Sequence, residues 1–142
     1  MLRLHKYIQN ELNEFILYHK NYTNRIIHVL TGIVYMTCLN ILIYKGKFLI
    51  VYFIILFLTF PYIIISIISV FILFCTSYIL LKYKINPYIL LIVFTICCFI
   101  VPEISHYLTN EKTIININTS PIKIITNIFY FLPFSIFSIT KK

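Results

Sequence analysis

The chain has 142 residues, enough for one domain, but 61% of them are hydrophobic, only 11% are charged, and the mean hydropathy is +0.94. This composition excludes an ordinary soluble globular protein and indicates an integral membrane protein. The net charge of +8 does not indicate a nucleic-acid partner, because the twelve Lys and Arg flank apolar runs in small groups and build no basic face. We therefore predict an all-α fold in which residues 1–142 form a single membrane domain, a polytopic helical bundle.

Residues 1–22 are predicted to form an amphipathic helix followed by an elbow. Within 2–19 the apolar side chains recur at helical spacing and polar side chains fill the positions between them. A helix of this kind lies at a membrane surface and does not cross the membrane. We expect the segment to be retained, because Glu11 and Glu14 interrupt it and it lacks the apolar core of a cleavable signal peptide.

Residues 24–101 are predicted to hold four helical spans, the first at 26–44. The next run, 48–81, has 34 residues without a charge. As one helix it would be about 50 Å long, whereas the hydrocarbon layer is about 30 Å thick. Pro61 lies near its middle and disfavours helix at the residue before it, so we predict two short helices joined by a hairpin turn near Pro61.

The fourth span, 88–101, is predicted to end at Pro102. A polar segment that contains His106 follows, and the remainder of 102–142 includes an apolar helix over 121–140. Because Lys123 and Pro133 interrupt that helix, the sequence leaves open whether it spans the membrane or lies in the interface.

If 48–81 crosses the membrane twice, His19, His28 and His106 all lie at one face of it. The distribution of Lys and Arg then places this histidine face in the cytosol. If 48–81 crosses once, His106 lies on the opposite side and the three histidines share no site.

His19 and His28 are nine residues apart, on opposite sides of an unbroken helix. The turn "NYTN" between them favours a helix end near Lys20 or Asn21 and a new helix capped by Thr23 or Asn24. Such an elbow lets the two imidazoles converge on a metal ion. The alternative is a pair of interfacial histidines, each hydrogen-bonded to water or to a carbonyl.

His106 is expected just past a helix end, where oxygen ligands are close in sequence. Glu103 and Asn110 share its helical face, whereas Glu111 needs a bend to join them. Histidines with oxygen ligands and open positions suit Fe(II), and such sites activate O2. His5 is not expected to take part, because about 21 Å of helix separates it from His19.

Two motifs, "YHKNYTNRIIHVLTG" and "ISHYLTNEK", resemble those of a family of small multi-span membrane proteins. The characterised fungal member of that family is an Fe(II)-dependent 2-hydroxy fatty acid dioxygenase. The positions in register are His19, Asn24, Arg25, His28 and Gly32 in the first motif and Ser105, His106, Glu111 and Lys112 in the second. One departure is that the family's Glu follows its His after three or four residues, whereas Glu111 follows His106 after five.

The resemblance implies an endoplasmic reticulum enzyme that uses O2 to shorten 2-hydroxy long-chain fatty acids by one carbon, as in the α-oxidation branch of phytosphingosine breakdown. It implies Fe(II) bound by His19, His28 and His106, with Asn24 and Glu111 as catalytic residues. A non-catalytic membrane protein that organises or binds lipid is the alternative. A small transporter or channel subunit ranks last, because spans two to four contain no charged residue.

Overall fold

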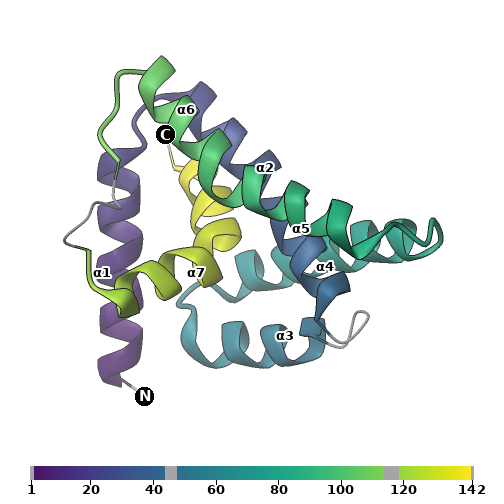
Figure 1. Ribbon diagram of the computed structural model, residues 1–142. Coiled ribbons are helices and arrows are strands. Elements are labelled where there is room, and N and C mark those ends of the chain that lie inside the picture. Colours follow the sequence, from purple (N-terminus) through teal and green to yellow (C-terminus); the bar gives the residue numbers. More distant parts are fainter. Residues whose placement is uncertain (1, 44–47, 114–118, 142) are drawn as a thin grey trace.

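The computed structural model describes residues 2–43, 48–113 and 119–141, and its regular elements are all helical (Figure 1). The helices are α1 (Leu2–Tyr18), α2 (Tyr22–Leu42), α3 (Phe48–Thr59), α4 (Ile63–Leu81), α5 (Pro87–Thr95), the π-helix η2 (Ile96–Ile100), α6 (Val101–Leu108) and α7 (Pro121–Thr140). No strand occurs in the described ranges, so the predicted all-α class is confirmed.

Four helices are long and apolar enough to cross a membrane: α2, α4, the continuous helix Pro87–Leu108 and α7. They indicate an integral membrane protein. Three of them coincide with predicted spans, and α7 corresponds to the C-terminal segment whose role the sequence left open. The remaining predicted span, α3, has 12 residues, and a helix of that length measures about 18 Å, less than the hydrocarbon thickness of about 30 Å.

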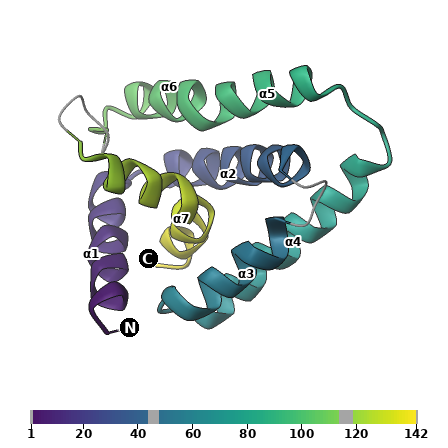
Figure 2. The ribbon, with the colours of Figure 1, turned by 60° about the horizontal axis from the view of Figure 1, so that its bottom comes forward.

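The break predicted at Pro61 is present. α3 ends at Thr59 and α4 begins at Ile63, and the two helices run back along each other (Figure 2). Phe60, at the turn, is buried against the ring of Phe134 in α7. The missing N–H of Pro61 breaks the helix, and the packing of Phe60 stabilises the resulting hairpin.

The prediction that the fourth apolar run ends as a helix at Pro102 is wrong. The helix continues to Leu108, because the π turn η2 precedes the proline and the N–H of Val101 bonds the carbonyl of Ile96. In an α-helix the ring of Pro102 would collide with the carbonyl four residues before it, and the wider π turn relieves that clash. His106 consequently lies in the last turn of α6 and not beyond a helix end.

α2 occupies the centre of the bundle and contacts α4, α5, η2, α6 and α7. It runs antiparallel to the long helix made by α5, η2 and α6 (Figure 2). Polar bonds tie it to its neighbours: the Thr37 and Thr76 hydroxyls are 2.7 Å apart, and Asn40 Nδ2 donates to Ser77 Oγ at 2.8 Å. Between membrane helices such bonds contribute about 0.6 kcal/mol each on average and fix the rotation of one helix against another.

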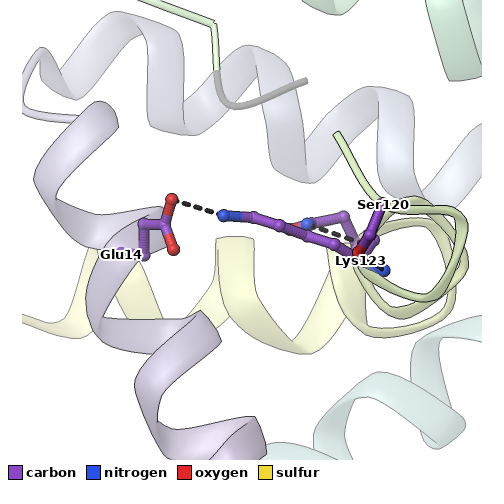
Figure 3. Close-up of polar contacts among 4 residues, drawn as sticks. Glu14, Ser120 and Lys123 are labelled. Atoms are coloured by element: carbon purple, nitrogen blue, oxygen red, sulfur yellow. Dashed lines mark hydrogen bonds and ion pairs between the residues drawn. The ribbon is translucent and has the colours of Figure 1, made fainter. Parts of the chain in front are cut away.

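α1 packs on the bundle through an apolar face and one ion pair. Ile8, Leu12 and Phe15 are fully buried. Lys123 Nζ of α7 lies 2.5 Å from Glu14 Oε1, and the backbone N–H of Lys123 donates to Oγ of its helix cap Ser120 (Figure 3). The lysine that interrupts the C-terminal apolar run therefore has a carboxylate partner on α1.

Gly32 of α2 lies directly against α7. It is buried, and a Cβ at this position would lie 3.1 Å from Phe131 Cδ1 and 3.5 Å from the backbone of Leu132. A glycine here lets the two helices approach closely, as small residues do between membrane helices.

We expect Gly32→Leu to lower the free energy of unfolding by about 1–3 kcal/mol, because the added side chain overpacks the contact between α2 and α7. Thermal unfolding of the detergent-purified protein measures the effect. Val34→Leu is the matched control, since Val34 is 40% exposed on the same helix. Equal stability of both variants would show that α2 and α7 do not approach each other at Gly32.

Candidate metal centre

The elbow between α1 and α2 places His19 just after the last turn of α1. Its backbone N–H still bonds the carbonyl of Phe15 at 3.1 Å. The helix cap of α2 is Asn21, whose Oδ1 accepts from the N–H of Thr23 at 2.8 Å. The prediction that Thr23 or Asn24 caps α2 is therefore wrong: both lie inside the helix, and Asn24 is 0% exposed with its side chain turned into the protein.

The elbow and the end of α6 bring three histidines together, as predicted. His19 and His28 are 1% exposed and His106 is 4% exposed. One ring nitrogen from each lies within 4.8 Å of the other two, and the Nε2 atoms of His28 and His106 are 3.2 Å apart. Among the described residues this is the one group of His, Cys, Asp and Glu side chains that can hold a metal ion.

His19 is prepared as a ligand by its hydrogen bonds. Its Nδ1 donates to the carbonyl of Phe15 at 2.6 Å, which leaves the lone pair on Nε2. That Nε2 is buried without a hydrogen-bond partner, a condition that costs about 1–3 kcal/mol unless something satisfies the atom. Burial lowers the pKa of His19 to about 4, against the opposing effect of the Phe15 carbonyl, so the ring is neutral at pH 7, as metal binding requires.

The spacing of the other two rings also fits a metal ion. Two imidazole nitrogens that bind one tetrahedral ion at about 2.0–2.1 Å lie about 3.3 Å apart, and the Nε2 atoms of His28 and His106 are separated by 3.2 Å. Without an ion the same distance suits a hydrogen bond between the two rings. The buried and unpaired nitrogen of His19 is the feature that a histidine–histidine bond alone does not satisfy.

Asn24 and Ser105 lie behind two of the rings. Ser105 Oγ donates to Asn24 Oδ1 at 2.6 Å and lies 3.4 Å from Nδ1 of His28, while Asn24 Nδ2 lies 3.4 Å from Nδ1 of His106. Groups in this position orient metal-binding imidazoles and select their tautomers. Asn24 thus contacts a ligand ring, and its catalytic role stays a prediction.

Glu111 lies in the chain that follows α6, and its carboxylate hydrogen-bonds to the elbow. Asn110, at φ 54°, reverses the chain so that the Glu111 carboxylate reaches α2. Its Oε1 accepts from the N–H groups of Lys20 and of Asn21, the latter at 2.7 Å, and its Oε2 accepts from Asn24 Nδ2 at 2.6 Å. Its oxygens are therefore directed at the protein and not at the ring nitrogens.

The Glu111 carboxylate is ionised at neutral pH. Burial by itself raises the pKa of this group, but the N–H donors of Asn21, Asn24 and Lys20 together lower it below the usual value. Of the other oxygen ligands considered from the sequence, Glu103 and Asn110 are both exposed, and neither belongs to the histidine group. His5 does not belong to it either.

Arg25 holds the elbow from its other side. Its Nε donates to the carbonyl of His19 at 2.6 Å, and its Nη1 donates to the carbonyls of Ser138 and Lys141 at 2.7 and 2.9 Å. It thereby satisfies carbonyls at the C-terminal end of α7 and fixes His19 against that helix end. No local sequence signal indicates this contact, because Ser138 is 113 residues away.

Aromatic rings pack against two of the ligands. Phe15 stacks on His19 with ring centroids 3.8 Å apart, and Phe131 stacks on His28 at 5.0 Å. The first contact follows from helical spacing, since Phe15 precedes His19 by four residues. The second depends on the approach of α7 at Gly32 and has no local sequence signal.

The cluster opens onto a cavity of about 270 Å³ whose walls are mainly apolar. The walls come from α1, α2, η2, α6 and α7, and the non-histidine polar residues that line it are Glu103, Thr113 and Asn127, besides the phenol of Tyr35. A cavity of this composition suits a ligand with an apolar body and a polar end.

No family model, curated protein or solved structure matches this chain. The class of protein is therefore defined by the fold and the site: an all-α protein with four helices of membrane-spanning length and a buried three-histidine centre that can hold a metal ion.

Protein purified in detergent is expected to bind a transition-metal ion stoichiometrically, and His19→Ala, His28→Ala and His106→Ala are each expected to lose it, because a missing ligand removes both affinity and geometry. Elemental analysis and metal titration measure this. His5→Ala is the control and should keep the metal. Full metal content in His28→Ala would contradict the site.

Glu111→Ala is expected to weaken metal binding about 10–100-fold, the usual effect of removing a group that positions the ligands. Glu111→Gln should not restore affinity, because in either orientation its amide N–H2 would face a donor, the elbow N–H groups or Asn24 Nδ2. Lys112→Ala, at the exposed residue next to Glu111, is the control and should bind metal normally. Unchanged dissociation constants in both Glu111 variants would show that the carboxylate does not position the histidines.

Proposed function

We propose that the protein is an Fe(II)-dependent dioxygenase that shortens 2-hydroxy long-chain fatty acids by one carbon. The observation that carries the proposal is the buried histidine cluster with the unpaired Nε2 of His19, placed at an apolar cavity in a bundle of membrane-length helices. The resemblance of the two sequence motifs to the dioxygenase family points the same way.

The ligand set is that of a catalytic metal ion, and the proposed reaction with O2 selects iron because zinc has no redox chemistry. Structural zinc sites are closed by four protein ligands, whereas His19, His28 and His106 leave positions open. Fe(II) held by imidazoles supplies the open positions and the redox chemistry that a reaction with O2 requires.

The cavity supports a fatty acid as the substrate. Its wall offers Phe15, Phe131, Ile124 and Ile128 to a hydrocarbon chain, and burial of such a chain contributes about 0.8 kcal/mol per methylene. A 2-hydroxy acid carries a carboxylate and a hydroxyl on adjacent carbons, which suits a centre with open positions. An unhydroxylated acid lacks the second oxygen.

The reaction is R–CH(OH)–COOH + O2 → R–COOH + CO2 + H2O. The bond between the first two carbons breaks, the second carbon is oxidised to a carboxyl group, and O2 takes up all the electrons, so no external reductant is needed. In this reaction Asn24 and Ser105 hold the imidazoles of His28 and His106, and Glu111 keeps the elbow closed. The stacked rings of Phe15 and Phe131 exclude water from the histidines.

The proposal includes a location: the endoplasmic reticulum membrane, with the histidine face toward the cytosol.

The second candidate function is a non-catalytic lipid-binding membrane protein. The apolar cavity favours it, because such a cavity holds a lipid chain whether or not a reaction follows.

The test supplies Fe(II)-loaded protein in membranes with a 2-hydroxy long-chain acid and measures O2 uptake and the shortened acid by mass spectrometry. We expect turnover that an iron chelator abolishes, little reaction with the unhydroxylated acid, and none in His28→Ala. His5→Ala should react like the original protein.

Full activity in His28→Ala would overturn the mechanism, and loss of activity in His5→Ala alone would show that the active site does not use His19, His28 and His106. Saturable binding of the acid without O2 uptake in the iron-loaded protein would support the lipid-binding candidate instead.

A further inference from the structure

The cavity at the histidine cluster extends away from it along two antiparallel helices. Tyr35 lines the cavity and follows His28 by seven residues on α2, a distance of about 10 Å along the helix. On the opposite wall Cys98 lines it and precedes His106 by eight residues. Because α2 and the Pro87–Leu108 helix run antiparallel, both residues lie in the same direction from the histidines (Figure 2).

The end of the cavity far from the histidines is formed by fixed side chains. Tyr35 is 1% exposed, and its hydroxyl donates to the carbonyl of Ile128 on α7 at 2.5 Å. Its ring contacts Phe94 and Phe131 edge-on, with centroids 5.9 and 5.5 Å away. A chain that extends along this wall from the histidines therefore meets Tyr35, whereas the side toward Phe99, which is 48% exposed, is open.

The π turn helps to form this wall. It holds one residue more than an α-helical turn, which rotates the preceding stretch by about 100° relative to an unbroken α-helix. Cys98 and Phe99 of η2 line the same cavity as Pro102 and His106 of α6. Cys98 is the small side chain at the far end of this wall, and a larger residue there would shorten the cavity.

We infer that this cavity binds the part of the acyl chain nearest the carboxylate, with the carboxylate end at the histidines, and that Tyr35 and Cys98 set the length of chain that the protein encloses. The inference rests on the proposed function and adds a specificity-determining site to it. This part of the chain is bound inside the protein, so each methylene excluded from the cavity weakens binding about fourfold, equivalent to about 0.8 kcal/mol.

The chain contains no tryptophan, so one can be introduced as a reporter. Phe94→Trp places an indole beside Tyr35 without changing a residue that lines the cavity. Phe74→Trp, at a site 58% exposed on α4, is the control fluorophore. The ligands are 2-hydroxy acids of increasing length that carry bromine, a fluorescence quencher, on the terminal carbon, and binding is measured under argon so that no O2 reaction occurs.

We expect saturable quenching of Phe94→Trp with an optimum chain length, and only non-saturable quenching of Phe74→Trp. Adding Cys98→Phe should weaken binding of the longest bound acids at least about tenfold, the effect of excluding two methylenes, and leave the shorter acids unaffected. Cys97→Phe is the matched control, because the neighbouring cysteine is also partly buried but does not line the cavity. If Cys98→Phe does not fold, Cys98→Leu tests the same loss of space.

An unchanged length profile in the Cys98 variant that folds, or identical quenching at the two tryptophans, would overturn the inference. The experiment also separates this inference from the proposed function. Length-selective binding without any turnover in air would support the cavity assignment and remove the dioxygenase. Turnover of 2-hydroxy acids with the same length preference in Cys98→Phe would support the dioxygenase and overturn the cavity assignment.

Discussion

The carboxylate of Glu111 is the contact on which the geometry of the site depends. It accepts N–H groups from both residues of the elbow that follow His19 and from the side chain of Asn24, which itself contacts His106. The elbow would otherwise leave backbone donors without partners where two helices end. Arg25 binds the His19 carbonyl from the opposite side. The ligands are thus held by two charged groups whose hydrogen bonds go to backbone atoms and, for Glu111, also to Asn24.

The sequence predicted the elements whose signals are local. The elbow and the break at Pro61 follow from turn residues and proline chemistry. The sequence predicted that His19, His28 and His106 meet only if 48–81 crosses the membrane twice, and they meet although α3 is shorter than a span. The cap of α2 was misplaced because Asn21 and Asn24 have the same intrinsic preference for a cap. Only the buried partners of Asn24 decide between them, and Glu111 and Ser105 are more than eighty residues away along the chain.

Two other features could not be predicted from the sequence. The length of the fourth apolar helix was misjudged because proline in a helix is compatible with a π turn, whose formation depends on the packing around it and not on a recognisable motif. The packing of Phe131 on His28 and the contacts of Arg25 with the end of α7 join residues that are about one hundred positions apart. The histidines could thus be found by residue type and spacing, and the motif resemblance also pointed to Asn24, Ser105 and Glu111, whereas these two long-range contacts had no signal in the sequence.

The π turn has an evolutionary consequence. A turn of this type is equivalent to one inserted residue, so loss of a single codon between Ile96 and Ile100 would convert it to an ordinary α-helical turn. The apolar surface and the length of the helix would hardly change, but Cys98 and Phe99 would no longer share a face with His106. Descendants of this protein can therefore keep the bundle and lose the cavity in one step, and relatives of the same length and hydropathy need not share its chemistry.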